Sequence, residues 1–331
     1  MRAVLRLVLL LALGAGAMAG AAWWWLQRPL PLATPTVEVT VAPGTSPRAV
    51  AEQWVAAGVQ TPPELLWLWF RVSGRSHQMR AGDYVIERGV TPRQLLERLL
   101  RGEQQFESVR IVEGWTFKQM RMALAGAPTL RPTTQGMSEA QIMAALGLPK
   151  TAAEGRFFPD TYHYSRGATD LSVMRTAQQT LQRKLEAAWA ERAKDLPLAS
   201  MDEALILASI VEKETGIEAD RVKVASVFTN RLRIGMPLQT DPAVIYGLGA
   251  AFDGNLRKRD LLADTPFNTY TRKGLPPTPI ALPGAASIKA AVQPAETKAL
   301  YFVARGDGSS VFSDNLADHN RAVNKFQRGG N

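Results

Sequence analysis

Residues 200–216 read SMDEALILASIVEKETG, and this stretch carries the signals for both ends of one helix. Ser200 is a preferred residue just before a helix, and Glu203 three positions later can reach back to it, which is the capping-box pattern. A run of apolar residues follows, and Gly216 is of a type that commonly ends a helix. The stretch therefore predicts a helix whose last turn carries two glutamates, Glu212 and Glu214.

The two glutamates differ in the direction in which they leave this helix. At about 100° per residue, Glu214 projects onto the middle of the apolar arc, whereas Glu212 points roughly 160° away. The arc is formed by Ile206, Leu207, Ile210 and Val211. Burial and the negative end of the helix dipole both raise the pKa of a carboxyl group placed like Glu214, as a general acid requires. The pattern alone also allows an ordinary charged helix end or a buried hydrogen-bonding carboxylate.

Two downstream segments combine polar residues with Gly and Pro, as loops that present side chains do. They are residues 229–247, TNRLRIGMPLQTDPAVIYG, and residues 266–284, PFNTYTRKGLPPTPIALPG. Their candidate donors and acceptors for sugar hydroxyls and N-acetyl groups are Gln239, Thr240, Asp241, Asn268 and Tyr270. The plainer alternatives are that Asp241 starts a turn and that Asn268 caps one. Upstream, residues 154–164, EGRFFPDTYHY, offer Glu154, Asp160 and Tyr162.

Several other chemistries lack their residues. The chain has no cysteine, which excludes disulfides and thiol nucleophiles, and its three histidines lie far apart with no zinc-ligand spacing. No G-x-S-x-G or G-x-x-x-x-G-K-[ST] motif occurs. The net charge of +9 accompanies no basic stripe interleaved with aromatic residues. We therefore expect a glutamate-centred site without metal or cofactor, and no nucleic-acid partner.

The N-terminus predicts a membrane anchor. Leu7 to Leu26 run without a charge, which as a helix gives roughly 30 Å, the thickness of a bilayer core. Arg2 and Arg6 precede the run and three tryptophans, residues 23–25, end it, which favours a cytoplasmic N-terminus and an exported body. The alternative is a cleaved signal peptide, because residues 17–19, AMA, satisfy the small-x-small cleavage pattern.

A Pro-rich spacer, residues 29–36, precedes a pattern that occurs three times between residues 37 and 126. Each copy reads as a strand, a Gly with Ser or Thr, a helix, and a closing Gly: Gly58, Gly102 and Gly126. The pattern predicts a small α/β region there. Between the first two copies, Trp67 and Trp69 could stack on sugar rings, although core packing is their more common use.

Four blocks resemble the MltG-type (YceG-like) endolytic murein transglycosylases. They are LASIVEKETG (207–216), VASVFTNRLRIGMPLQTDPAVIYG (224–247), NTYTRKGLPPTPIALPG (268–284) and YFVARGDG (301–308) followed by F, N and HN. The resemblance extends from about residue 37 to 328. It implies an α+β protein with an anchor and cytoplasmic tip (1–28), a linker (29–36), a LysM-like subdomain (37–103) and a mainly helical, mixed catalytic domain (104–331).

The resemblance also implies an activity and its acid. The family's catalytic glutamate falls on Glu214, before the small hydroxyl residue Thr215. The implied reaction cleaves MurNAc–GlcNAc bonds within nascent peptidoglycan strands in the periplasm, leaves 1,6-anhydroMurNAc ends and so ends elongation beside penicillin-binding synthases of the inner membrane. We expect Tyr162 and the five loop residues named above to contact substrate, and Glu212 and Thr215 to support Glu214.

Two other functions stay open. A glycoside hydrolase would pair Glu214 with a second carboxylate, from Asp241, Glu154 or Asp160. A non-catalytic peptidoglycan-binding scaffold for cell-wall synthases would instead use the small α/β region. The first predicts a product carrying one added water, and the second predicts binding without cleavage.

Overall fold

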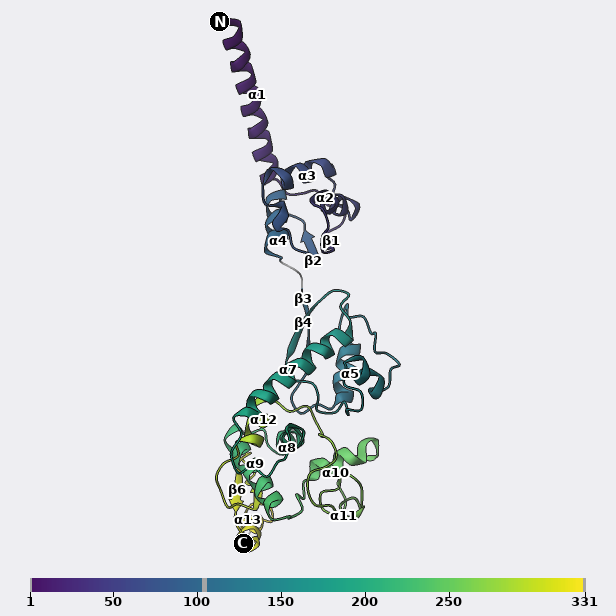
Figure 1. Ribbon diagram of the computed structural model, residues 1–331, viewed down its shortest axis with the longest axis vertical. Helices are drawn as coiled ribbons and strands as arrows, with labels where there is room; N and C mark the ends of the chain where they lie inside the picture. The colour runs from purple at the N-terminus through teal and green to yellow at the C-terminus, as the bar shows by residue number, and fades with distance from the viewer. Residues whose placement is uncertain (1, 103–105, 330–331) are drawn as a thin grey trace. The chain divides into compact units, whose positions relative to one another are not determined.

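The computed structural model describes residues 2–102 and 106–329 and divides into two compact units, Met1–Glu107 and Ser108–Asn331 (Figure 1). The fold mixes helix and sheet and is about half helical, in agreement with the α+β class expected. Each sheet has two strands, in the orders β1-β2, β3-β4 and β5-β6.

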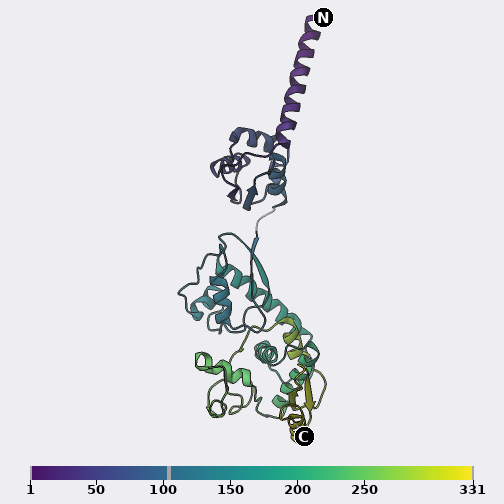
Figure 2. The same ribbon diagram turned by 180° about the vertical axis from the view of Figure 1, so that it is seen from behind.

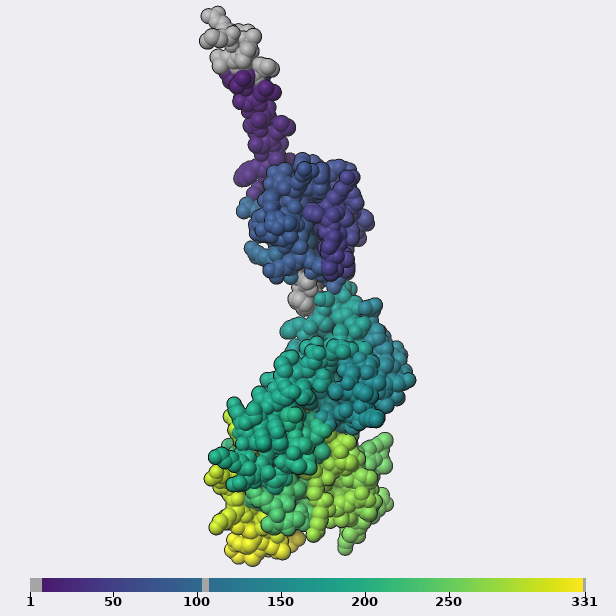
Figure 3. Space-filling view, in the orientation of Figure 1, coloured from purple at the N-terminus to yellow at the C-terminus, as the bar shows by residue number. Residues whose placement is uncertain are grey.

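The first unit begins with a long helix, α1 (Arg2–Gln27). Within it, Val8–Gln27 is long and apolar enough to cross a membrane, and none of it is buried in the protein. Figure 3 shows the coloured part of α1 extending away from the rest of its unit. Only near its end does α1 join the fold, where Trp25 packs on the unit's core. These properties are consistent with a single-pass anchor.

The rest of the first unit has two strands and three α-helices. In order they are β1 (Thr36–Val41), α2 (Pro47–Ala56), α3 (Pro63–Val72), a short 3-10 helix η1 (Ser76–Gln78), β2 (Gly82–Glu87) and α4 (Pro92–Arg101). The strands are antiparallel, with Thr36 opposite Glu87 and Val41 opposite Gly82. The two predicted helix starts after β1 and β2 are confirmed, because Ser46 and Thr91 cap α2 and α4.

The third copy of the predicted pattern lies in the other unit, so the prediction of one α/β region from 37 to 126 is wrong. Its strand β3 (Phe106–Arg110) pairs with β4 (Thr161–Ser165), and its helix α5 (Phe117–Ala125) packs in a separate core. The local signals were sound, since Thr116 and Gln119 form the expected capping box. Pairing with a strand about fifty residues away decided the domain, and local sequence does not encode that.

The second unit is mainly helical. After α5 it contains α6 (Glu139–Ala145), β4, α7 (Asp170–Ala190), α8 (Met201–Glu214), α9 (Glu218–Arg233), α10 (Asp241–Leu248), η2 (Gly249–Ala251), α11 (Lys258–Leu262), α12 (Ala285–Val292), β5 (Tyr301–Ala304), β6 (Ser310–Ser313) and α13 (Leu316–Phe326). Helix α8 contacts α7, α9, α10 and α12. Figures 1 and 2 show it between α9 and α12 on one side and α10 on the other.

Helix α8 is buried on all sides rather than on one arc. Every residue from Ala204 to Val211 is buried, including Ser209, which does not belong to the predicted apolar arc. Its start follows the predicted cap with one change. Ser200 accepts from the Glu203 N–H at 3.2 Å, but the Glu203 carboxylate bonds the N–H of Ala199 instead of that of Ser200. The buried helix thus fixes the position of Glu214, its last residue.

Candidate active site

Glu214 is the last residue of α8, at the point where the helix leaves the core. The next residue, Thr215, is extended, and its hydroxyl accepts a hydrogen bond from the N–H of Ile217 at 3.0 Å. Helix α9 starts one residue later, at Glu218. Thr215 therefore shapes the turn between α8 and α9, directly after Glu214.

One protein group fixes the Glu214 carboxyl. The Thr240 hydroxyl donates to Oε1 at 2.5 Å, and Thr240 is itself buried, so it holds Glu214 and is not the substrate contact that was predicted. Its backbone N–H donates to the Thr269 hydroxyl at 3.0 Å, which donates back to the Thr240 carbonyl at 3.3 Å. Within residues 2–102 and 106–329, no donor bonds to Oε2 of Glu214. The protein therefore holds one of the two Glu214 carboxyl oxygens through a hydrogen bond.

The surroundings raise the pKa of Glu214 to about 7. Burial is the main cause, because a charged carboxylate is poorly solvated there. The hydrogen bond from Thr240 lowers the pKa, the negative charge of Asp241 raises it, and the positive charge of Arg231 lowers it. The net result is a group that holds a proton in a substantial fraction of molecules at neutral pH.

Arg231 is a buried cation beside this carboxyl that the sequence did not lead us to name. It is oriented by its Nε, which donates to the Leu300 carbonyl at 2.7 Å, and by Nη1, which donates to the Leu238 carbonyl at 2.7 Å. Its guanidinium lies 5.3 Å from the centre of the Tyr301 ring. Helix α9 thus places a positive charge near Glu214, where it favours the charged form of that carboxyl group.

Two further predicted residues, Gln239 and Asp241, flank Thr240 in the chain. The Gln239 backbone has a φ of 52°, in the left-handed region that non-glycine residues rarely occupy, and its N–H donates to the Thr269 carbonyl at 3.0 Å. The Asp241 carboxylate accepts a hydrogen bond of 2.5 Å from the Tyr270 hydroxyl. Backbone strain of this kind is often found at functional sites.

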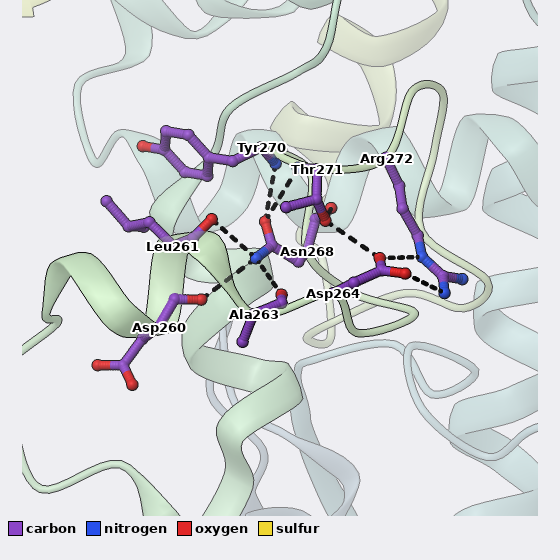
Figure 4. Close-up of polar contacts among 8 residues, drawn as sticks. All are labelled: Asp260, Leu261, Ala263, Asp264, Asn268, Tyr270, Thr271 and Arg272. Atoms are coloured by element: carbon purple, nitrogen blue, oxygen red, sulfur yellow. Dashed lines mark hydrogen bonds and ion pairs between the residues drawn. The ribbon is translucent and has the colours of Figure 1, made fainter.

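Asn268 links Tyr270 to the segment that contains α11 (Figure 4). Its side-chain amide is buried and donates to the carbonyls of Asp260, Leu261 and Ala263, while its oxygen accepts from the N–H of Tyr270 at 2.9 Å. These bonds use both ends of the amide. Asn268 therefore positions Tyr270 and does not itself face a ligand, which corrects the predicted substrate contact.

A cleft of about 480 Å³ opens beside Glu214. Its lining combines four groups of residues: Glu214, Arg231, Leu238, Gln239, Asp241 and Tyr270; Tyr301 to Ala304 of β5; Leu316, His319, Asn320 and Val323 of α13; and Gln327. The His319 ring stacks on Tyr301 with centroids 5.1 Å apart. The residues from β5 and α13 form a second wall of the cleft. The sequence analysis did not predict this wall, although both segments belong to the fourth quoted block.

The remaining predicted residues lie outside the cleft. Tyr162 is buried in the core around α5 and donates its hydroxyl to the Phe158 carbonyl at 2.7 Å, so it is not brought to Glu214. Glu212 accepts from the N–H of Gly284 at 2.9 Å, at the start of α12. Glu154 is buried elsewhere, and Asp160 bonds the N–H of Thr161. None of these four residues lines the cleft.

In the described part of the chain, no three His, Cys, Asp or Glu side chains group closely enough to hold a metal ion.

The sequence profile of the YceG-like family matches residues 39–325, most of the chain. The chain belongs to the YceG-like family. Its curated relatives include the endolytic murein transglycosylase of Bacillus subtilis, 31% identical over 88% of this chain and 85% of that protein. The endolytic murein transglycosylase of Streptococcus pneumoniae strain D39 is 28% identical over 74% of this chain, which spans about half of that protein (50%).

A solved structure also resembles this YceG-like chain. The crystal structure of a YceG-like protein from Listeria monocytogenes matches with a TM-score of 0.55 and 27% identity, over 87% of this chain and 98% of that one. Sequence and fold therefore agree on the family.

Proposed function

We propose that this protein is a lytic murein transglycosylase that cuts MurNAc–GlcNAc bonds within peptidoglycan strands and leaves 1,6-anhydroMurNAc ends. The observation that carries the proposal is Glu214: one carboxyl with a pKa of about 7, held by one hydrogen bond, on the wall of an open cleft. The names of the relatives, endolytic murein transglycosylase, support the same substrate class.

The reaction needs one carboxyl group that acts twice. Protonated Glu214 donates its proton to the glycosidic oxygen as the bond from C1 of MurNAc to that oxygen breaks. The Glu214 carboxylate then takes the proton from the MurNAc 6-hydroxyl, whose oxygen forms the new bond to C1. The proton balance closes on Glu214, and no water is consumed. Arg231 stabilises the carboxylate between the two steps.

The two sides of the cleft suit a sugar chain. Gln239, Asp241 and Tyr270 supply polar groups near Glu214, and the stacked pair of Tyr301 and His319 supplies a ring surface on the other wall. Ring faces pack well against the apolar faces of sugars, while carboxylate, amide and hydroxyl groups bond their hydroxyls.

A hydrolase is the second candidate, because Asp241 lines the same cleft as Glu214. A hydrolase needs a second carboxylate free to act as base or nucleophile. Asp241 already accepts a 2.5 Å bond from Tyr270, and Glu154 and Asp160 lie off the cleft. We therefore favour the one-carboxyl reaction.

The cellular location of the protein is part of the proposal. We propose that α1 is retained as an inner-membrane anchor with a cytoplasmic N-terminus. The second unit would then act in the periplasm, on strands made by penicillin-binding synthases. Cleavage of these strands would end their elongation. The β-α-α-β order of β1, α2, α3 and β2 supports a LysM-like, glycan-binding role for the first unit. A non-catalytic scaffold would share that role but leave the cleft unused.

Mass spectrometry of the products tests the reaction class. The full-length protein is incubated with defined, uncrosslinked glycan strands. Transglycosylation predicts internal cuts and ends one water lighter than a reducing end. Reducing ends would establish the hydrolase instead, and bound but uncut strands would establish the scaffold.

A further inference from the structure

Helix α3 leaves a row of large apolar side chains uncovered. Leu65, Leu68 and Val72, spaced by three and four residues along one side of the helix, are 44%, 48% and 72% exposed. On another side, Leu66 and Phe70 are fully buried in the core of the first unit. The fold therefore uses one side of α3, and the row on the other side needs a different apolar environment.

The uncovered row faces a groove shared with the candidate membrane span. The groove has a volume of about 550 Å³ and only apolar or aromatic lining: Leu65, Leu68, Trp69 and Val72 from α3, and Met18, Ala21, Ala22, Trp25 and Leu26 from α1. All five α1 residues belong to the span Val8–Gln27. When that span lies in a bilayer, lipid contacts the α1 side of the groove. The same lipid then contacts the α3 side.

The position of α3 in its unit fits a membrane surface. Figures 1 and 2 show α3 lying across the end of the unit from which α1 emerges, with β1 and β2 toward the opposite end. A helix placed across that end can lie along the plane of the bilayer that α1 crosses. Interfacial helices bury their apolar side about 5 to 10 Å into the boundary between headgroups and acyl chains.

The rim of this end carries the residues typical of a headgroup layer. Trp23 and Trp24 are exposed on α1, and the Arg28 guanidinium lies 4.1 Å above the Trp24 ring. On α3, the guanidinium of Arg71 lies 5.5 Å from the Trp67 ring. Tryptophan rings favour the interface, and arginine can bond lipid phosphates while its stem stays on apolar surface.

We propose that α3 is an interfacial membrane helix, whose Leu65, Leu68 and Val72 side chains lie among the acyl chains of the leaflet at which α1 enters the first unit. The proposal depends on α1 spanning the bilayer and not on the reaction at Glu214. The bilayer is favoured over a partner protein because one wall of the groove is the span itself. Two contacts, α1 and α3, then hold the first unit against the membrane.

The absence of cysteine makes a labelling test straightforward. Three single-cysteine variants of the full-length protein, Leu68→Cys, Ala42→Cys and Ala15→Cys, are labelled with an environment-sensitive fluorophore and reconstituted in phospholipid vesicles. Nitroxide lipids then serve as quenchers. Ala15 lies within the span and reports its insertion, whereas Ala42 is exposed just beyond β1 and is the matched soluble control. We expect quenching at 15 and 68 and none at 42.

Each other outcome contradicts the proposal. Quenching at 15 without quenching at 68 shows that α3 stays in water, and equal quenching at 68 and 42 shows no defined placement. No quenching at 15 removes the spanning helix and the proposal with it. A label at 68 that is open to water in vesicles but shielded in cell envelopes identifies a protein occupant instead.

A second variant tests the row itself. Leu65→Gln with Val72→Gln in the Leu68→Cys background should reduce quenching at 68 at least about twofold, because apolar burial drives interfacial binding. Both positions are exposed, so thermal unfolding should be unchanged. Unaltered quenching at 68 in this variant would contradict a role for the row.

Discussion

Two carboxyl groups of the second unit, Glu214 and Glu154, share a pKa of about 7, and in both burial is the main cause. Their surroundings differ. Glu214 accepts one hydrogen bond and lines a cleft of about 480 Å³. Glu154 is 7% exposed and accepts from the N–H groups of Phe117 and Gly155 and from the Tyr246 hydroxyl. A raised pKa marks burial, and access to a ligand is what makes one of these groups a candidate acid.

The surroundings of Glu154 are closed by close packing. A Cβ on Gly155, whose φ is 76°, would lie 2.3 Å from Cβ of Pro279, so only glycine fits there. Glu154 joins the first turn of α5, through the N–H of Phe117, to α10, through Tyr246. It therefore acts as a structural junction between two parts of the unit.

The largest expected difference between the two groups is in catalysis. Replacing Glu214 with Gln keeps its size but removes the titrating proton, so strand cleavage should fall by a factor on the order of 10² to 10⁴. Replacing Glu154 with Gln, the matched control, should leave the rate within a few-fold. Initial rates on purified glycan strands measure both. A loss of equal size in the two variants would contradict the distinction.

Removing the Glu154 side chain should cost stability instead. Glu154→Ala leaves the buried N–H groups of Phe117 and Gly155 without their acceptor, so the free energy of unfolding should fall by about 2–4 kcal/mol. Denaturant unfolding at neutral pH measures the change, with exposed Glu186→Ala as the control. An effect no larger than that of the control would show that the junction does not stabilise the fold.

Glu214→Gln should change stability in the opposite direction. The folded-state pKa is raised above the ordinary value of 4.5, so the charged form opposes folding above about pH 7, and that opposition disappears below about pH 4.5. The variant should be more stable than wild type by about 1–3 kcal/mol near pH 8, and the gain should vanish near pH 4. Unfolding curves at both pH values test this; a gain that persists at acid pH would contradict it.

The smallest expected effect concerns Thr240. Its hydrogen bond lowers the pKa of Glu214, so Thr240→Val should raise that pKa and move the alkaline fall in rate upward by about half to one pH unit. Thr240→Ser keeps a hydroxyl and should retain the wild-type profile. The pH dependence of the cleavage rate measures the shift. A downward shift in the Val variant would reverse the role assigned to Thr240.

The part of the site around Glu214 could be predicted from the sequence, because short local patterns mark its helix and its loop. Helix signals at Ser200 and Gly216 bounded α8, and polar loops rich in Gly and Pro marked Gln239, Thr240 and Asp241. The second wall was not predicted, because β5 and α13 reach Glu214 only through tertiary packing across about ninety residues of chain. Arg231 was missed for a related reason, since the Leu300 carbonyl to which its Nε donates lies 69 residues away along the chain.

Tyr162 shows a signal that was present but not used. Residues 161–165 alternate between exposed and buried along β4, and Tyr162 falls on the buried positions with Tyr164. A strand with period two would have placed both tyrosines in a core. The error at the 37–126 region is different in kind, because strand pairing is set by partners that are remote in sequence.

The central claim is that Glu214 alone shuttles the proton and that no water enters the product. Full-length wild type, Glu214→Gln and Glu154→Gln are incubated with uncrosslinked glycan in ¹⁸O-labelled water. Mass spectrometry then measures the mass of the new strand ends. We predict unlabelled 1,6-anhydro ends from wild type and from Glu154→Gln, and almost no ends from Glu214→Gln. Heavy oxygen in the new ends, or anhydro ends formed by Glu214→Gln at the wild-type rate, would contradict the account.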